Sequence, residues 1–229
     1  NLVTNRESFN PEVITLGIGG NDAGFGEKLK SCLMPGTCEF ATSEDKRAEL
    51  VEELAGEKSR LERVYRTVKN EAPESRVYVH GYPQFVTYPV VTCAANVHLN
   101  EVEVRFIHEA IKYFNDVIEA AAKSAGVYYV DVENILENVN LCSGASDERM
   151  AFNGATAGND IEVGVIGDVI TGGICYVRTG CIGSESFYPN QKGHEMYKST
   201  ILNLTNDLTA LMPTENSSLI PIPSDYFGF

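Results

Sequence analysis

Tryptophan and Cys-x-x-Cys pairs are both absent from this 229-residue sequence, and 18 lysines and arginines are outnumbered by 32 acidic residues. Without a Cys-x-x-Cys pair or metal-ligand spacing among His, Asp and Glu, no zinc ribbon or redox dithiol is expected, and no metal or other cofactor is predicted. The net charge of −14 repels phosphate backbones, so nucleic acid is not an expected partner. No apolar run approaches the ~20 residues of a membrane-spanning helix. The sequence opens at Asn1 without a Met or a signal peptide, so we expect a processed or excised piece.

Strand-like and helix-like segments alternate along the sequence. Three short β-branched apolar segments predict strands, the first of them buried, and three stretches with apolar residues every three or four positions predict helices. The strands are expected at 12–17, 76–81 and 127–131, and the helices at 43–72, 100–125 and 197–211. In the first helix, the apolar stripe includes Leu61, Val64 and Val68. The alternation indicates an α/β fold with a parallel sheet, but three strands are few for this class, so we expect further strands of the sheet to lie outside the sequence.

One domain is expected over residues 1–211, followed by a proline-rich extended tail or linker at 212–229. Within the domain, 138–184 is rich in Gly and Cys and indicates an insertion, in which apolar segments on either side of Gly172-Gly173 predict a β-hairpin. A structureless loop of that length is unusual in a compact domain, so we expect the insertion to be ordered or functional.

The number and arrangement of the cysteines suggest disulfides. The six are Cys32, Cys38, Cys93, Cys142, Cys175 and Cys181. The first two and the last two each close a short loop, which leaves the middle two for each other, although 15 pairings are permitted by sequence alone. An even count arranged in this way predicts an oxidising, extracellular compartment. N-glycosylation sequons begin at Asn203 and Asn216 and matter only in a eukaryotic source.

Residues 17–25, with the sequence GIGGNDAGF, begin where the first predicted strand ends. Open α/β sheets bind ligands beyond the carboxyl ends of their strands, which is where this spacing places Asn21. Glycines permit close approach to a substrate, and an Asn amide that donates to a developing oxyanion contributes about 3–4 kcal/mol of transition-state stabilisation. The alternative is an ordinary Gly-Asn turn. The preceding strand and the following Ala-Gly-Phe favour the oxyanion-hole interpretation over this turn.

Gly19-Gly20-Asn21-Asp22 resembles the third block of the SGNH (GDSL-type) hydrolase family, whose Asn is an oxyanion-hole donor. Further matches are to the extracellular lipases and esterases of the actinobacterial type. Their small and longer disulfides resemble Cys32–Cys38 and Cys93–Cys142, and their fourth strand and last block resemble His80-Gly81-Tyr82-Pro83 and residues 185–194. The resemblance extends over residues 11–211. It implies a three-layer, flavodoxin-like α/β fold, of which this chain supplies the later three strands, and a carboxylic-ester hydrolase.

The sequence departs from the family at the catalytic residues. The family's Gly-Asp-Ser block, with its nucleophile, and the block with the oxyanion glycine have no match here. In the last block, Asp-x-x-His-Pro-Asn in the family, Tyr188 occupies the position of the His base and Glu185 that of the Asp. A tyrosine hydroxyl, with an ordinary pKa near 10, is a poor base at neutral pH. His194, six residues beyond Tyr188, is the alternative base, whereas His80 is expected to point into helix packing or toward a partner group.

Two functions are consistent with these features. The first is a secreted, lipase-like or esterase-like SGNH domain that is incomplete or impaired, so that this chain alone is expected to be inactive. An upstream segment or a separate chain would then complete the sheet and supply the serine and the glycine. The alternative is a non-catalytic scaffold or binding module of an extracellular assembly. The expected ligand is an ester, a lipid or a glycan, and a Gly-Asp-Ser motif upstream would favour the enzyme.

Overall fold

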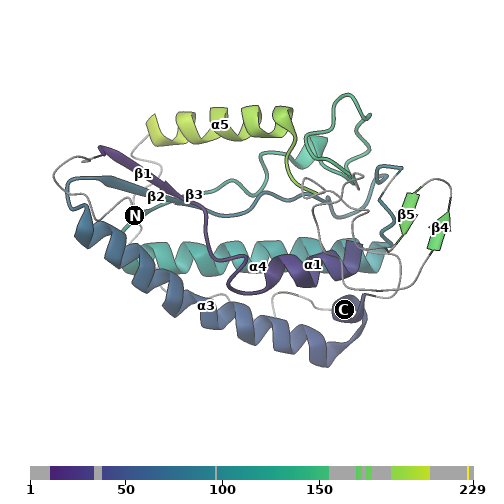
Figure 1. The fold of residues 1–229 in the computed structure, drawn as a ribbon, viewed down its shortest axis with the longest axis horizontal. Helices are drawn as coiled ribbons and strands as arrows, with labels where there is room; N and C mark the ends of the chain where they lie inside the picture. Colours follow the sequence, from purple (N-terminus) through teal and green to yellow (C-terminus); the bar gives the residue numbers. More distant parts are fainter. Residues whose placement is uncertain are drawn as a thin grey trace.

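The structure, a computed structural model, describes residues 11–33, 38–95, 97–154, 169–171, 174–176, 187–206 and 226. Its main sheet has three parallel strands in the order β1 (Val13–Leu16), β2 (Arg76–His80) and β3 (Tyr128–Val130). Figure 1 shows α5 (Gln191–Asn206) on one face of this sheet, and α4 (Glu101–Ala125) with α3 (Glu44–Glu71) beside it on the other. The three layers confirm the predicted α/β class and the parallel sheet.

Both long helices begin and end where the sequence provides caps. The Ser43 hydroxyl accepts a hydrogen bond from Lys46 N at the start of α3, and Asn100 and Glu103 form a reciprocal capping box at the start of α4. Gly126 ends α4 with a φ of 67°, a left-handed conformation that glycine adopts without strain. These local signals explain why the predicted bounds agree with the observed helices to within one residue.

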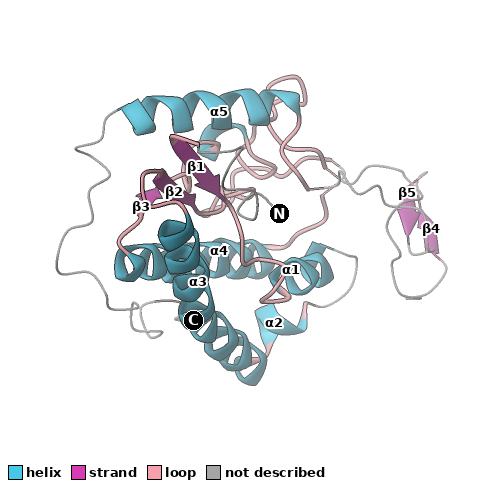
Figure 2. Cartoon of the chain, turned by 60° about the vertical axis from the view of Figure 1, so that its left-hand side comes forward, coloured by secondary structure: helices cyan, strands magenta, loops and turns pink. Residues whose placement is uncertain are grey.

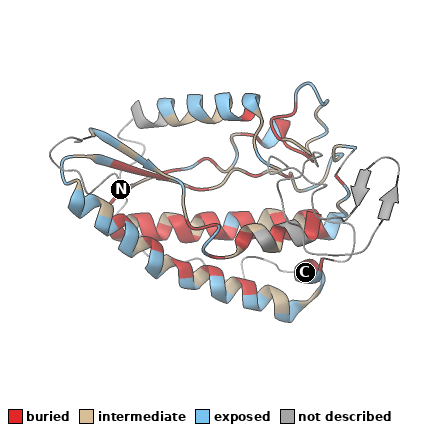
Figure 3. Ribbon diagram, viewed as in Figure 1, coloured by how far each residue is buried: buried red, intermediate tan, exposed pale blue. Residues whose placement is uncertain are grey.

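Helix α4 forms the centre of the hydrophobic core (Figure 3). It contacts α3 on one side and the strands β2 and β3 on the other. Five of its large apolar side chains have at most 1% of their surface exposed, namely Phe106, Ile107, Ile111, Phe114 and Ile118. Because burial of one such side chain stabilises a fold by about 1.5–3 kcal/mol, this helix makes a large contribution to the core.

Strand β1 is exposed where the sequence predicts a buried strand. Its residues alternate between exposed and half-buried, and Val13 keeps 42% of its surface exposed. Among the described residues β1 pairs only with β2, so it forms an edge of the sheet. A run of apolar residues predicts burial on both faces, but only neighbouring strands and covering helices provide it.

A hollow of about 620 Å³ lies between α3 and the residues just after β1, and Asp22, Glu57, Arg60, Arg63 and Thr67 contribute its polar lining. Ile18, which follows β1, and Leu61, Val64 and Val68 of α3 contribute its apolar lining. Val64, predicted on the apolar stripe of α3, is 43% exposed. Part of the apolar stripe of α3 is therefore not covered by other described residues.

Three short helical elements are not predicted from the sequence. They are α1 (Phe25–Leu33), α2 (Glu39–Thr42) and the 3₁₀ turn η1 (Glu137–Val139). Elements of this length contain too few turns for a hydrophobic period to be recognised. A disulfide between Cys32 and Cys38 joins α1 to the N-cap of α2.

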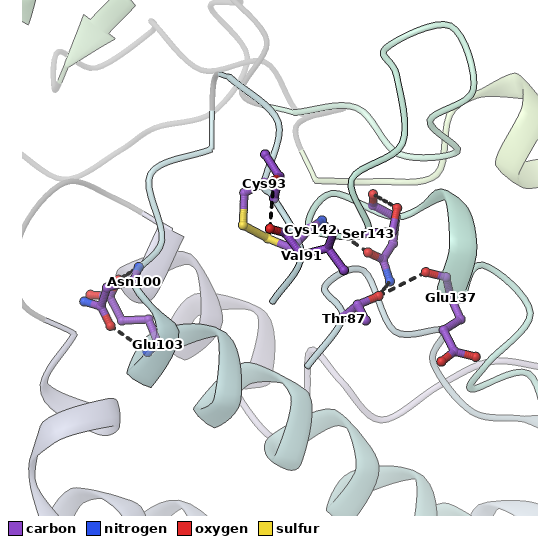
Figure 4. The surroundings of a disulfide bond; sticks show 10 residues. Thr87, Val91, Cys93, Asn100, Glu103, Glu137, Cys142 and Ser143 are labelled. Atoms are coloured by element: carbon purple, nitrogen blue, oxygen red, sulfur yellow. Dashed lines mark hydrogen bonds between the residues drawn. A yellow bond between two sulfur atoms is a disulfide. The ribbon is translucent and has the colours of Figure 1, made fainter. Parts of the chain in front are cut away.

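The predicted Cys32–Cys38 and Cys93–Cys142 disulfides are both present. Cys93–Cys142 connects the segment before α4 to the segment after η1 (Figure 4), where Val91 N also donates to Cys142 O at 3.4 Å. The predicted Cys175–Cys181 pair extends outside the described residues.

The described parts of the insertion and the tail lie outside the main sheet. Within the 138–184 insertion, β4 (Val169–Thr171) pairs antiparallel with β5 (Ile174–Tyr176), at a distance from the main sheet (Figure 2). Tyr226 is the described residue of the tail, and its ring lies 5.2 Å from that of Tyr113 in α4. None of the helices in the described ranges combines the length and the apolar character needed to cross a membrane.

Candidate active site

The loop after β1 brings Asn21 to the carboxyl end of the sheet. Gly19 has a φ of 109°, which L side chains rarely adopt, and a Cβ there would lie 2.9 Å from Leu61. A Cβ on Gly20 would lie 2.8 Å from the Tyr82 hydroxyl, to which the Gly20 N–H donates a hydrogen bond at 3.0 Å. Backbone conformation and close packing therefore require both glycines, and Asn21 follows them with its side chain exposed.

Tyr82, which follows β2, holds this loop in place. Its ring stacks on Phe114 with centroids 5.7 Å apart. The Asn115 amide accepts from Tyr82 N at 2.7 Å and donates to Tyr82 O at 2.9 Å and to Glu133 at 3.0 Å. A Cβ on Gly81 would lie 2.3 Å from Asn115 Oδ1, so glycine is required here too. Burial raises the pKa of the Tyr82 hydroxyl, which therefore stays neutral and able to accept from the loop.

Residues 187–190 form another wall of the site. Asn153 N donates to Tyr188 O at 3.0 Å, and Phe187 N donates to Asn153 O at 3.1 Å. Phe187 has a φ of 65°, which is uncommon for an aromatic residue and indicates local strain. The backbone here is thus fixed, while the Tyr188 side chain remains 56% exposed.

Helix α5 begins directly after this wall. Asn190 Oδ1 accepts a hydrogen bond from Gly193 N at 3.1 Å, as an N-cap does. A Cβ on Gly193 would lie 2.2 Å from Ala151 O, so only glycine permits this approach of α5. His194 lies in the first turn of the helix and is exposed.

These segments line a cleft of about 530 Å³ beyond the carboxyl ends of β1 and β2. Its apolar lining includes Phe25, Leu29, Leu33, Phe85, Phe152 and Phe187. Its polar lining includes Asn21, Asp22, His80, Tyr82, Tyr188, His194 and Tyr197. No lysine or arginine is among the described residues that line it. A mostly apolar cleft of this volume, with a few polar groups, is typical of small-molecule sites.

Three of the four predicted site residues share this cleft. Asn21, Tyr188 and His194 all line it, although they are far apart in the sequence. Glu185 lies outside the described residues. The roles predicted for these residues remain predictions, because their positions alone do not establish chemistry.

The sequence did not assign His80 and Tyr197 to the site. His80 ends β2, and Tyr197 reaches it from α5, with 2.6 Å between Tyr197 Oη and His80 Nδ1. Burial lowers the pKa of His80, and its hydrogen bond with the Gly81 carbonyl partly opposes this shift. The alternation of β2 could have placed His80 on the same face as Tyr78. That α5 covers this face and brings Tyr197 to His80 is seen only in the structure.

The sequence profile of the GDSL-like Lipase/Acylhydrolase family matches residues 3–196. The chain belongs to this family. Membership confirms the resemblance drawn from Gly19-Gly20-Asn21-Asp22 and the last block.

Two lipases of Streptomyces are among the relatives of this GDSL-like chain. It is 31% identical over 137 residues to "Lipase 1" of Streptomyces coelicolor and 32% identical over 136 residues to a lipase of Streptomyces rimosus. Each match covers 58% of the chain, and 47% and 48% of the two relatives, so the chain spans about half of their length.

Two solved structures share the fold. The extracellular lipase of Streptomyces rimosus aligns with a TM-score of 0.54, 23% identity and coverage of 82% of this chain and 69% of the lipase. Phospholipase A1 of Streptomyces albidoflavus aligns with a TM-score of 0.57, 23% identity and coverage of 89% and 76%. Both likenesses support a three-layer SGNH fold, of which the chain contains part of the sheet.

Proposed function

We propose that the chain is part of a secreted carboxylic-ester hydrolase and forms the oxyanion side of its cleft. The observation that carries the proposal is the exposed Asn21 at the end of β1, in a mostly apolar cleft that Tyr188 also lines. An apolar lining without cationic side chains, as described, suits an uncharged ester with an apolar acyl chain. The lipases among the relatives support the same substrate class.

In this proposal the Asn21 amide donates to the carbonyl oxygen of the ester as negative charge develops on it. The fixed backbone of Gly19 and Gly20 supports the role, because a preorganised donor needs no reorganisation during the reaction. Tyr188 occupies the position of the family's histidine base. Since a tyrosine hydroxyl is a weak base at neutral pH, we expect slower turnover than a histidine would give.

We further propose that a strand from outside these 229 residues, in an upstream segment or on a separate chain, pairs with β1. Within the described ranges β1 has an open edge and Val13 is exposed, and both support it, because unpaired strand edges are normally covered in soluble proteins. The hollow that Ile18 and Val64 help to line could accommodate elements flanking such a strand. The Cys32–Cys38 and Cys93–Cys142 disulfides support an extracellular location.

The second candidate is a non-catalytic scaffold or binding module that keeps the fold. Tyr188 favours it, because this change falls at the family's base. In that case the cleft binds a lipid or glycan ligand without turnover.

Hydrolysis of p-nitrophenyl acetate by the full-length protein tests the proposal. Under the hydrolase proposal, Asn21→Ala lowers kcat about 10²- to 10³-fold, the loss seen when one oxyanion donor is removed. Asn70→Ala, which changes an exposed asparagine of α3 outside the cleft, leaves kcat unchanged. A wild-type protein without hydrolysis that gains it through Tyr188→His would support the scaffold instead. Equal activity of Asn21→Ala and wild type would refute the assigned oxyanion role.

A further inference from the structure

His80 lies between the sheet and α5, with Nδ1 hydrogen-bonded and the Cε1–Nε2 edge of its ring packed against Gly17. Its Nδ1 lies 3.1 Å from Gly81 O and 2.6 Å from Tyr197 Oη, and Tyr197 Oη also donates to Gly81 O at 3.3 Å. The rings of His80 and Tyr197 meet edge to face, with centroids 5.3 Å apart. A Cβ on Gly17 would lie 2.6 Å from His80 Nε2. The imidazole therefore lies directly against Gly17, four residues before Asn21.

These contacts select one tautomer of the His80 ring. A carbonyl oxygen only accepts hydrogen bonds, so a bare Nδ1 lone pair 3.1 Å from Gly81 O would be repelled by it. With the proton on Nδ1, the ring donates to Tyr197 Oη and Gly81 O, and Tyr197 donates its own proton to Gly81 O. Nε2 is then left unprotonated, on a side chain that lines the cleft. Histidine is often used in this way: one ring nitrogen donates a hydrogen bond that fixes the ring, and the other nitrogen acts as a base.

The other described histidines are less suited to this role. His194 lines the cleft but is exposed, and His98 is exposed outside it. His108 lies on α4, where its Nδ1 is buried without a partner among the described residues.

We propose that His80 is the proton acceptor for ester hydrolysis in this cleft, with Tyr197 as the residue that positions its ring. The inference rests on the proposed function and explains how a family member with tyrosine at position 188 turns over. The nucleophile is a hydroxyl group, supplied by a serine outside this chain or by water. Its proton moves to His80 Nε2 while its oxygen bonds to the ester carbonyl carbon, and the carbonyl electron pair moves onto the oxygen that Asn21 faces.

The second half of the step returns His80 to its starting state. The carbonyl reforms, the bond from carbon to the alcohol oxygen breaks, and the departing oxygen takes the proton from Nε2. A serine nucleophile leaves an acyl-enzyme, which water cleaves by the same sequence to give the acid. Atoms and charges balance without a further reactant.

Burial makes the neutral, basic form of His80 the resting one. Tyr197 faces it from α5, and Asp22, Tyr82, Tyr188 and His194 line the same cleft. Burial raises the pKa of Tyr197 and Tyr82, so both hydroxyls are neutral at physiological pH. Burial lowers the pKa of His80 below its ordinary value of about 6.5, so the imidazole is neutral there too. Activity should therefore be full at neutral pH and fall as acid protonates His80.

The test is a pH–rate profile of p-nitrophenyl acetate hydrolysis by the full-length protein and four variants, His80→Asn, Tyr197→Phe, Tyr188→Phe and His98→Asn. His80→Asn keeps a side-chain N–H near the position of Nδ1, so it retains the bonds to Gly81 and Tyr197 while removing the base. It should lower kcat about 10²- to 10⁴-fold, with KM within about twofold and the acidic limb of the profile lost. Tyr197→Phe should lower kcat by a smaller factor without changing KM, and His98→Asn should change neither. Circular dichroism and thermal unfolding establish that each variant is folded.

The possible outcomes separate this inference from the proposed function. If the wild type hydrolyses the ester and His80→Asn keeps its kcat and its acidic limb, His80 is a packing residue and only the present inference fails. If activity survives in His80→Asn and disappears in Tyr188→Phe, the base lies in the last block, again overturning this inference alone. A wild type with no hydrolysis overturns both. If His80→Asn fails to fold, loss of kcat and a changed acidic limb in folded Tyr197→Phe support the proposal, and an unchanged profile refutes it.

Discussion

Replacing Tyr82 with phenylalanine should loosen the loop that carries Asn21. The hydroxyl accepts the Gly20 N–H at 3.0 Å, and Gly20 is buried, so Tyr82→Phe leaves a buried donor without an acceptor. A buried donor that loses its partner costs about 1–3 kcal/mol. The ring itself should stay stacked on Phe114, 5.7 Å away, so little apolar contact is lost. For a chain of this size the expected drop in Tm is about 2–12 °C.

Tyr78→Phe is the matched control for this change. Tyr78 lies in β2, is 1% exposed, and its buried hydroxyl has no hydrogen-bond partner among the described residues. Removing that hydroxyl should change the free energy of unfolding by no more than about 0.5 kcal/mol or should stabilise the fold. Urea unfolding of the full-length protein measures both variants, with the slope checked to be unchanged.

Stability and activity together decide whether this reasoning holds. If Tyr82→Phe and Tyr78→Phe unfold at the same urea concentration, the bond from Gly20 N to the Tyr82 hydroxyl does not stabilise the loop. If Tyr82→Phe is destabilised as expected, kcat should also fall, because the loop that positions Asn21 is less fixed. An unchanged kcat would show that Asn21 is held by other contacts.

Two further predictions concern stability. Gly81→Ala places a Cβ 2.3 Å from the buried Asn115 amide and should destabilise the fold by about 1–3 kcal/mol, whereas Gly56→Ala, with nothing within 4 Å of its Cβ, should stabilise α3 by about 1 kcal/mol. Equal urea midpoints for the two variants would contradict the close packing at Gly81. Burial raises the pKa of Tyr129 and Tyr197, so their contribution to stability is present below pH ~10, where tyrosines of the unfolded chain begin to ionise, and is lost as the pH rises further. Thermal unfolding between about pH 7 and 11 checks this, and a constant Tm up to pH 11 would contradict it.

The helices and the order of the strands could be predicted because their signals are local. Ser43 and Asn100 cap the two long helices, and Gly126 ends the second, so their bounds follow from short-range hydrogen bonding. The burial of β1 could not be predicted in this way. An apolar strand has the same sequence whether or not a second strand pairs with it, and Val13 is exposed because, in the described part of the chain, β1 has one neighbour.

The residues of the site likewise divide into those with a local sequence signal and those that only the packing reveals. Gly19-Gly20-Asn21-Asp22 was recognisable as a short motif, and the structure shows that backbone conformation and close packing require its two glycines. His80 was predicted to face packing or a partner group, since no sequence period indicates which strand-end residue borders a cleft. Its assignment to the site depends on Tyr197, which is 117 residues away in the sequence.

The sequence by itself determined the family, the α/β class and the position of Asn21 after the first strand, because each depends on short segments with a recognisable local pattern. The two disulfides followed from the resemblance to the family. The tertiary structure alone decided that β1 is an edge, that Tyr82 holds the loop through Gly20, and that His80 and Tyr197 meet in one cleft. Such contacts join segments far apart in the chain. They depend on how the sheet and its covering helices pack, which no local pattern of residues specifies.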